Sequence, residues 1–266
     1  KELAKRAQGK SVVHIHNSDI QDVLISYPTI DEQKSIIRYF HDFDNLITLH
    51  QRKLELLEKF KKGLLQKMFP KEGSKIPELR FKGFTDAWEQ RKLGELGKVR
   101  SGVGFPGVEQ GGKNGIPFFK VSDMNNVGNE SEMIVANNYV TEEQIKSHRW
   151  SPIEELPAIF FAKVGAAVML NRKRLCRYPF LFDNNTMAYS LHSNKWNTEF
   201  AKTLFETIDL TSLVQVGALP SYNSGDIEAI KIYITSLYEQ EQIGKLFKNI
   251  DHLITLHQRY NKLIVV

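Results

Sequence analysis

The seven residues LITLHQR occur twice in this chain of 266 residues, at 46–52 and again at 253–259. The two copies lie 207 positions apart (253 − 46), and 15 of the 34 residues of 19–52 are identical to their counterparts in 226–259. A period of this length exceeds that of solenoid repeats and leaves room for a whole domain in each unit. The sequence therefore predicts a duplicated unit, with one complete domain between the two matching segments.

Both copies contain the sequence of a helix start. Thr29 and Glu32 fit the S/T-x-x-E capping box, and Ser236 with Glu239 repeats it with a different hydroxyl. In this box the hydroxyl accepts from a backbone amide and the carboxylate reaches back to the cap amide. No proline follows in the first copy until Pro70, which ends the helix. The sequence thus predicts a helix of about 40 residues in the first copy and the start of its equivalent in the second.

The apolar residues of both predicted helices step alternately by four and three, which is typical of a coiled-coil seam. We predict that the two helices pack antiparallel, which would bring the equivalent residues His50 and His257 together. The alternative is an amphipathic helix lying on the core of its own domain, but a narrow seam of about 40 residues favours helix pairing. The residues predicted to pair are Ile36, Phe40, Phe43, Ile47, His50, Leu54, Leu57, Ile243, Phe247, Ile250, Ile254 and His257.

The segment between the helices has the pattern of a mixed domain. After the linker PKEGSKIP, the runs IPFFKVSD, MIVANNYV, AIFFAKVGAAVML and EAIKIYI predict strands, while EEQIKSHRW and NTEFAKTLFETI predict helices. The fold class is therefore α+β, a globular domain flanked by two long helices. The predicted parts are a tail of a preceding domain at 1–28, a first helix at 29–70, the domain at 71–235 and the start of a second helix at 236–266.

The composition constrains the compartment. A single cysteine excludes an internal disulfide and fits a reducing cytosol. The longest apolar run, LPAIFFAKVGAAVML, is too short to span a bilayer and contains Lys163. We therefore expect a cytoplasmic protein without a membrane partner.

The residues do not assemble a recognisable active site. The run at 102–107 matches G-x-G-x-x-G, but Pro106 and further glycines keep the chain looping where a dinucleotide site needs a helix start. His14 and His16 have no accompanying cysteine or carboxylate cluster, so no metal site is expected. Cys176 lies between two arginines that would favour its thiolate, but no matched histidine or acid accompanies it.

One charged segment does suggest a partner. Residues 156–182 contain no Asp or Glu but five Lys and Arg residues, in a chain of net charge +5. Lys and Arg contact phosphates, and Arg and Asn also pair with base edges. The alternative is a solvated basic turn. We predict that this basic turn, the glycine loop and a loop at 215–223 line one DNA-binding face, through Lys113, Asn114, Lys120, Ser122, Lys163, Asn171, Arg172, Lys173, Arg174, Arg177, Asn184, Gln215, Ser221, Tyr222 and Asn223.

Taken in order, these segments resemble the specificity subunit of type I restriction–modification systems. GFTDAWEQRKLGELGKVRSG resembles the opening of a target-recognition domain, and FFAKVGAAVMLNRKRLCRYPFLFDNNTMAY resembles its central segment. VQVGALPSYNSGDIEAIKIYI followed by EQEQI resembles its exit into a conserved spacer helix. Because only the tail of a first recognition domain precedes the first helix, the chain is expected to be a fragment or a half-length form.

The resemblance implies a non-catalytic chain that reads one half of a bipartite site in double-stranded DNA and scaffolds methyltransferase subunits. It implies that S-adenosylmethionine binds the methyltransferase and that this chain holds no cofactor. It also implies that a restriction subunit can join, and that the spacer helices can mediate self-association. The assembled complex would be an adenine-specific DNA methyltransferase and ATP-dependent endonuclease. The alternative is a coiled-coil assembly protein whose globular domain binds another protein.

Overall fold

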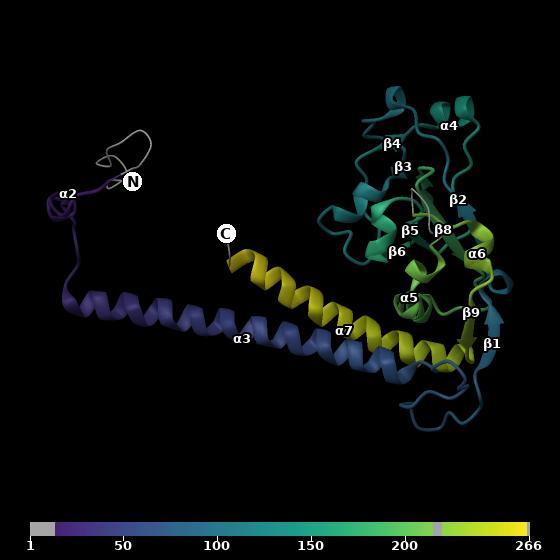
Figure 1. The fold of residues 1–266 in the computed structure, drawn as a ribbon, viewed down its shortest axis with the longest axis horizontal. Coiled ribbons are helices and arrows are strands. Elements are labelled where there is room, and N and C mark those ends of the chain that lie inside the picture. Colours follow the sequence, from purple (N-terminus) through teal and green to yellow (C-terminus); the bar gives the residue numbers. More distant parts are fainter. Residues whose placement is uncertain (1–13, 215–219, 265–266) are drawn as a thin grey trace. The chain divides into compact units, whose positions relative to one another are not determined.

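A computed structural model describes residues 14–214 and 220–264 (Figure 1). The chain divides into two compact units, one formed by residues 1–53 and 260–266 and the other by residues 54–259. The α-helices are α2 (Asn17–Gln21), α3 (Ile30–Met68), α4 (Glu142–His148), α5 (Thr198–Thr207), α6 (Ser224–Glu228) and α7 (Leu237–Ile264).

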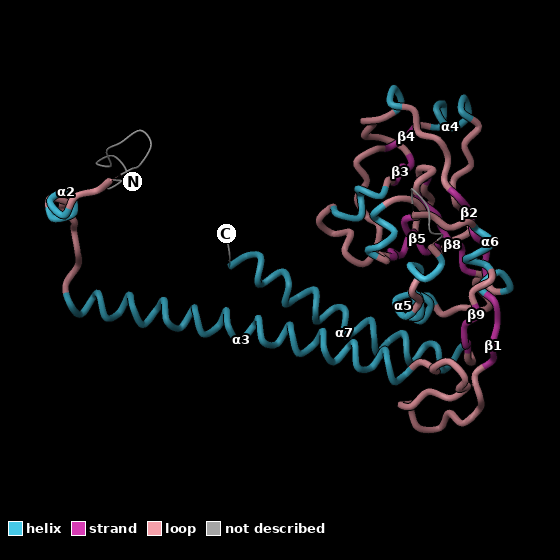
Figure 2. Tube along the Cα trace, viewed as in Figure 1, coloured by secondary structure: helices cyan, strands magenta, loops and turns pink. Residues whose placement is uncertain are grey.

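Three sheets form the frame of the second unit (Figure 2). The largest has the strand order β2-β8-β5-β6 and is antiparallel throughout. The smaller sheets are β4-β3-β7, in which β3 and β7 are parallel, and the pair β1-β9, which joins the two ends of the domain. The strands are β1 (Glu89–Lys92), β2 (Gly97–Ser101), β3 (Ile116–Phe119), β4 (Tyr139–Val140), β5 (Ala158–Ala162), β6 (Lys173–Cys176), β7 (Leu181–Phe182), β8 (Thr186–Leu191) and β9 (Lys231–Ile234).

The predicted α+β class is confirmed, but the strands differ from the predicted ones in detail. The run MIVANNYV is mostly loop and contributes only β4. The run that contains β5 stops at a glycine with positive φ, Gly165, and continues as a 3-10 turn, Ala166–Leu170. The basic segment predicted as a turn is instead the strand β6, which forms one edge of the largest sheet.

At both helix starts the hydroxyl contact of the predicted capping box is present. The amide of Glu32 donates to the Thr29 hydroxyl and that of Glu239 to the Ser236 hydroxyl, each at 3.4 Å. The carboxylate of Glu239, however, does not complete the capping box. It is buried and accepts from Arg80 Nε at 2.6 Å and Nη2 at 2.8 Å, because a guanidinium fork offers two charge-assisted bonds in place of one amide.

The repeat also reproduces local structure ahead of the long helices. The short helix α2 begins where the His16 amide donates to the Asp19 carboxylate at 2.9 Å. The helix α6 begins with the same bond, from the Asn223 amide to Asp226 at 2.8 Å. These two helices occupy equivalent positions of the two copies, so the duplication includes the end of a domain as well as a spacer helix.

The main core of the second unit lies between the largest sheet, α5 and the two long helices. The ring of Phe69, just after α3, lies 5.9 Å from Trp88, 5.7 Å from Phe200 on α5 and 6.1 Å from Phe247 on α7. Ile243 and Ile250 are buried in the same cluster. The first turns of α7 therefore pack on their own domain and on the end of α3.

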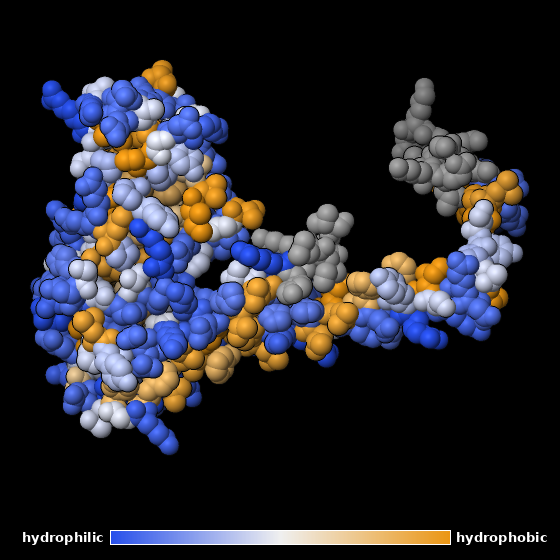
Figure 3. All heavy atoms as spheres, turned by 180° about the vertical axis from the view of Figure 1, so that it is seen from behind, coloured by the Kyte–Doolittle hydropathy of each residue, from blue (hydrophilic) through white to orange (hydrophobic). Residues whose placement is uncertain are grey.

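Over residues 54–69 the chain runs antiparallel to α7 (Figure 1). Two contacts show this direction: Lys61 contacts Asp251, and the later residue Phe69 contacts the earlier residue Phe247. The predicted antiparallel coiled coil along the full helices stays a prediction. In the first unit Ile36, Phe40 and Phe43 are exposed, and apolar surface follows this helix in Figure 3. His50 is half-buried and His257 is buried, but they belong to different units and their predicted meeting is not tested.

Candidate nucleic-acid interface

The candidate site lies where the strands of the largest sheet begin or end, and this side of the sheet is called the sheet edge below. All four strands have an end there. In the strand register Ser101 at the end of β2 and Phe161 near the end of β5 both face Met187 of β8. Phe161 also faces Lys173 at the start of β6. The glycine loop after β2, the turn after β5 and the loop before β8 therefore all leave the sheet at this edge.

Hydrogen bonds hold these loops against each other. Lys163 is the centre: its side-chain Nζ donates to Ser101 Oγ at 3.3 Å and its backbone amide donates to Asn185 O at 2.8 Å. The next residue, Val164, forms a bridge with Ser221. Asn184 and Asn185 are exposed beside them. The structure thus brings together the predicted DNA-binding residues Lys163, Asn184 and Ser221, which lie far apart in sequence.

The parallel pair β3-β7 adds a further loop to the same edge. The Asp183 amide donates to Phe119 O at 3.0 Å, so Lys120 and the exposed Ser122 follow directly beside the loop before β8. Lys120 Nζ donates to Gln110 of the glycine loop at 3.2 Å. Lys113 and Asn114 are exposed but precede β3, so they lie at the opposite end of that strand from Lys120.

The approach of the glycine loop requires a glycine. A Cβ on Gly102 would lie 1.9 Å from the backbone oxygen of Asp183, which no side chain could relieve. The neighbouring amide of Val103 donates to Phe182 O at 2.9 Å. This close backbone contact, not a nucleotide, explains the glycine at the start of the motif.

The basic strand β6 presents less free charge than its sequence indicates. Arg172, just before it, donates from Nη1 to Asn125 at 2.8 Å. Lys173 Nζ donates to Asn171 at 2.8 Å and to Ile208 O at 2.5 Å, and burial lowers the pKa of Lys173 to about 8. Burial also lowers the pKa of Arg174, which donates to backbone oxygens at 2.6 and 2.9 Å. The segment is therefore half-buried structure and not a solvated turn.

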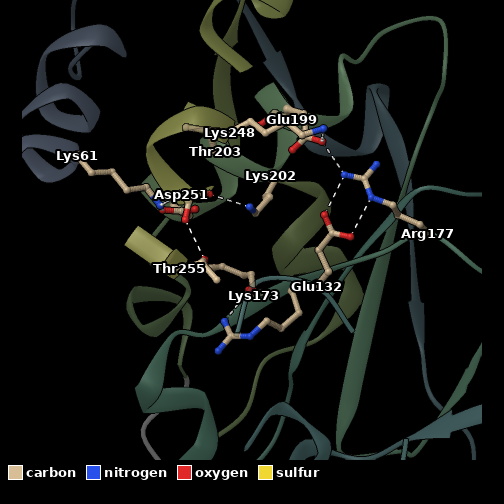
Figure 4. A network of polar contacts seen from close by, with 12 residues as sticks. Lys61, Glu132, Lys173, Arg177, Glu199, Lys202, Thr203, Lys248, Asp251 and Thr255 are labelled. Atoms are coloured by element: carbon tan, nitrogen blue, oxygen red, sulfur yellow. Dashed lines mark hydrogen bonds and ion pairs between the residues drawn. The ribbon is translucent and has the colours of Figure 1, made fainter. Parts of the chain in front are cut away.

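Arg177 lies at the opposite end of β6 and carries two ion pairs (Figure 4). Its guanidinium contacts Glu132 at 2.9 and 3.0 Å and Glu199 at 2.6 Å. Residues 156–182 contain no Asp or Glu, but acids from other parts of the chain lie beside Arg177. These ion pairs raise the pKa of Arg177 and give it a structural role in fastening α5 to the sheet.

Four further predictions meet buried or structural positions. The ring of Tyr222 is 4% exposed and its hydroxyl donates to Ala162 O, so its burial contradicts a direct DNA contact. Asn223 caps α6 and Asn171 accepts from the Leu210 amide at 3.0 Å, so both hold loops in place. Cys176 is buried, and burial raises the pKa of its thiol, contrary to the favoured thiolate. Gln215 lies outside the described residues.

A polar network joins α3, α5 and α7 within the second unit (Figure 4). Lys61 lies 2.5 Å from Glu206 and 2.7 Å from Asp251, which also binds Lys202 at 2.8 Å. Burial opposes the charge of Asp251, but these two lysines hold its pKa below the usual value. The network borders a cleft of about 460 Å³ that Arg172 and Arg174 also line. Its ion pairs fasten the sheet domain to the helices.

Other kinds of site are not indicated within residues 14–214 and 220–264. This part of the chain holds no group of three or more His, Cys, Asp or Glu residues placed to bind a metal ion. Among these residues no helix is both long enough and apolar enough to cross a bilayer.

Comparison with known proteins identifies the family. The family profile "Type I restriction modification DNA specificity domain" matches residues 1–59 and 85–265. The MjaVIII specificity subunit of Methanocaldococcus jannaschii is 25% identical over 286 residues, covering 97% of this chain and 62% of that subunit. The MjaIX specificity subunit of the same organism is 25% identical over 229 residues, covering 83% and 52%.

Solved structures share the fold. The type I restriction–modification S subunit from M. genitalium matches with a TM-score of 0.61 at 16% identity, over 98% of this chain and 65% of that one. The HsdS subunit from Thermoanaerobacter tengcongensis matches with a TM-score of 0.60 at 15% identity, over 98% and 61%. This chain thus spans about three fifths of the length of these relatives, and by its family match it belongs to the type I restriction–modification DNA specificity domains.

Proposed function

We propose that this chain is a non-catalytic reader of one half of a bipartite site in double-stranded DNA, within a type I restriction–modification complex. The observation that carries the proposal is the convergence of five loops at one sheet edge, around Lys163. Family membership and the names of the relatives support it. A single sheet edge that presents several loops from a rigid frame is the arrangement that a recognition surface needs.

The residues at this edge suit two parts of DNA recognition. The side chains of Lys120 and Lys163 donate to neutral groups, a Gln side chain and a Ser hydroxyl, so their charges are available to phosphates. Ser122, Asn184 and Asn185 are exposed and carry hydroxyl or amide groups that pair with base edges. Phosphate contacts set the orientation of the domain, and base contacts select the sequence.

Arg172 extends this surface toward β6. Its guanidinium has a neutral partner, Asn125, and its Nε is buried without a hydrogen-bond partner in the described structure. An arginine whose charge is not neutralised by a carboxylate can pair with a phosphate or with guanine. Lys113, Asn114 and Ser221 stay candidates for peripheral contacts, whereas Arg177 contributes through its ion pairs.

The remaining activities of such a complex are assigned to partners. Methyltransferase subunits would dock on the chain and bind S-adenosylmethionine, and a restriction subunit would supply ATP-dependent cleavage. The exposed apolar residues of α3 in the first unit offer a surface for self-association or for a partner's helices. The competing proposal, a protein-binding assembly module, would use exposed apolar surface, whereas Lys120, Lys163 and Arg172 at the sheet edge favour DNA.

Selection from a pool of random duplexes, followed by salt titration of the selected duplex, tests the proposal. The triple variant Lys120→Gln, Lys163→Gln, Arg172→Gln should bind at least tenfold more weakly. The slope of log binding constant against log salt concentration should also become less steep by roughly 0.9 for each phosphate contact removed. The matched control removes the same charge from the exposed lysines of the linker and the β1-β9 pair, at Lys75, Lys92 and Lys231. Equal effects of the two triple variants, or no selected sequence, would overturn the proposal.

A further inference from the structure

Two large apolar side chains project from the proposed interface without an obvious structural reason. The 3-10 turn Ala166–Leu170 is separated by three residues from the end of β5, and its last two residues are Met169 and Leu170. Met169 is 57% exposed and Leu170 is 59% exposed. Leaving two such side chains in water forgoes the free energy of burying them, so a partner that covers them would recover it.

The turn itself is firmly held. The Gly165 amide donates to Pro220 O at 2.9 Å, and the Asn171 amide donates to Val168 O at 2.9 Å. Between these ends Val168 is buried in the main core. The amide group of Asn171 donates to Ile208 O at 3.3 Å and accepts from the Leu210 amide at 3.0 Å, which fastens the turn to the next segment. The two apolar side chains are therefore held outward by a rigid scaffold, which lowers the entropic cost of a contact.

The position of the turn indicates the chemistry of what covers it. It leaves the sheet at the edge where Lys163 lies, and Arg172 follows it by two residues. Both cations have neutral partners, Lys163 at Ser101 and Arg172 at Asn125. Lys163 precedes the turn and Arg172 follows it, so along the chain the apolar pair lies between two cations. A duplex likewise has two rows of phosphates that flank its base pairs. Bases offer apolar contacts through the thymine methyl group in the major groove, or through their faces where a step is opened.

We propose that Met169 and Leu170 form an apolar base-contact point that helps to select one or two neighbouring base pairs of the half-site. This inference rests on the proposed DNA-reading function and adds a specificity-determining element to it. The contact is made without charge, so it contributes selectivity and affinity but releases no counterions. That property separates it experimentally from Lys120, Lys163 and Arg172.

The test compares the full chain with the double variant Met169→Ser, Leu170→Ser in selection from random duplexes. The variant should lose sequence preference at one or two adjacent positions and keep it elsewhere. On the duplex selected by the parent it should bind roughly tenfold more weakly, with an unchanged salt slope. The matched control, Ile76→Ser with Leu79→Ser, removes two comparably exposed apolar side chains from the linker and should change neither property.

Two substitutions in the selected duplex distinguish the sources of the contact. Replacing thymine by uracil at the affected position weakens the parent but not the variant if the methyl group is touched. A 2-aminopurine at that position brightens on binding the parent but not the variant if a base step is opened. Either result supports the inference, and an unchanged response to both overturns it.

Three other outcomes are decisive. A double variant that melts like the parent and selects the same sequence with the same affinity overturns the inference. The inference is also overturned if the variant selects the same DNA sequence as the parent but no longer binds a methyltransferase subunit, because the two side chains would then contact a protein. A parent that selects no sequence overturns the proposed function itself, and with it this element. Should the double variant fold poorly, Met169→Gln and Leu170→Gln tested singly give the same comparison.

Discussion

The two copies of the spacer helix carry nearly the same apolar residues but bury them very differently. Phe40 in the first copy is 62% exposed, whereas its equivalent Phe247 is 0% exposed. The difference lies in what covers the helix, because Phe69 packs on Phe247 and Phe200 belongs to the same buried cluster. The repeat therefore specifies a helix with a docking face, and the neighbouring segments decide whether that face is buried.

One position shows that the two docking faces are not interchangeable. Gly244 on α7 allows the start of α5 to approach closely, since a Cβ there would lie 2.7 Å from both Asn197 Oδ1 and Phe200 N. The equivalent residue of the first copy is Ile37, which is exposed. A domain that docked on the first copy could not approach this position as closely as α5 approaches α7.

Equivalent glutamines of the two copies, Gln33 and Gln240, make the same local contact but differ in their long-range contacts. Gln33 donates to Pro28 O at 2.8 Å and Gln240 donates to the equivalent Thr235 O at 2.8 Å. Only Gln240 also accepts from the Asn197 amide, at 2.8 Å. The local contact belongs to the repeat, and the long-range contact exists only where a domain is docked.

The largest expected effect follows from the phenylalanine pair. Phe247→Ala should lower the free energy of unfolding by about 3–5 kcal/mol, because it leaves a cavity beside Phe69. Phe40→Ala should change it by less than about 0.5 kcal/mol, as for other exposed positions. Urea denaturation of both variants measures the difference. Similar losses in the two variants would mean that Phe40 is also buried by a partner in solution.

Exchanging the helix residues at the close approach should give the next largest effect. Gly244→Ile should destabilise the chain by about 3 kcal/mol, since the new side chain must displace the backbone of α5. Ile37→Gly should cost only about 0.5 kcal/mol of helix propensity. Thermal melting followed at the α5–α7 contact, for instance by a probe at Lys248, separates the two. An unchanged melting temperature of Gly244→Ile would show that α5 and α7 can move apart without loss of stability.

The partly buried ion-pair network around Asp251 predicts that the stability of the fold depends on pH. The folded pKa of Asp251 is lowered, so its ion pairs stabilise the fold above the unfolded value of about 4 and are lost as the pH falls through the folded value. Asp251→Asn should cost about 2 kcal/mol at neutral pH and flatten the decline in stability below about pH 4. Asp44→Asn at the equivalent exposed position should cost less than about 0.5 kcal/mol at neutral pH. Denaturation curves between pH 2.5 and 7 check both variants.

Local sequence predicted the helices well and the sheet poorly. The capping residues and the apolar periodicity indicated α3 and α7, because both signals are local. The run MIVANNYV looked like a strand, but Asn129 accepts from the amides of Ile134 and Val135 at 2.8 and 2.9 Å and holds it as a loop. The charged residues of β6 are typical of an exposed turn, but the strand also contains Leu175 and Cys176, which are buried.

The candidate site depended on contacts that no short window contains. The acids that neutralise Arg177 lie 45 residues before it and 22 residues after it. Lys163 meets Ser101 across 62 residues, and only the strand order reveals that their loops share an edge. The apolar pattern predicts a strand through Met169 and Leu170, but the chain leaves the sheet before Gly165, which has a positive φ, and both side chains are exposed in the 3-10 turn that follows. The sequence could indicate the basic residues, but not which of them the fold would bury.

The helix caps should have the smallest effect, and they are where the two copies should agree. Thr29 and Ser236 make the same long hydrogen bond of 3.4 Å to the third helical amide, so neither depends on a docked domain. Thr29→Ala and Ser236→Ala should each lower the local stability of the first helical turn by about 0.5–1 kcal/mol. Amide hydrogen exchange at Glu32 and Glu239 measures this locally, because exposed turns open without unfolding the domain. Thr29→Ser and Ser236→Thr, which keep the hydroxyl, serve as controls. A much larger effect at Ser236 would show that the cap acts through the neighbouring Arg80–Glu239 ion pair, and the copies would then differ even in their most local contact.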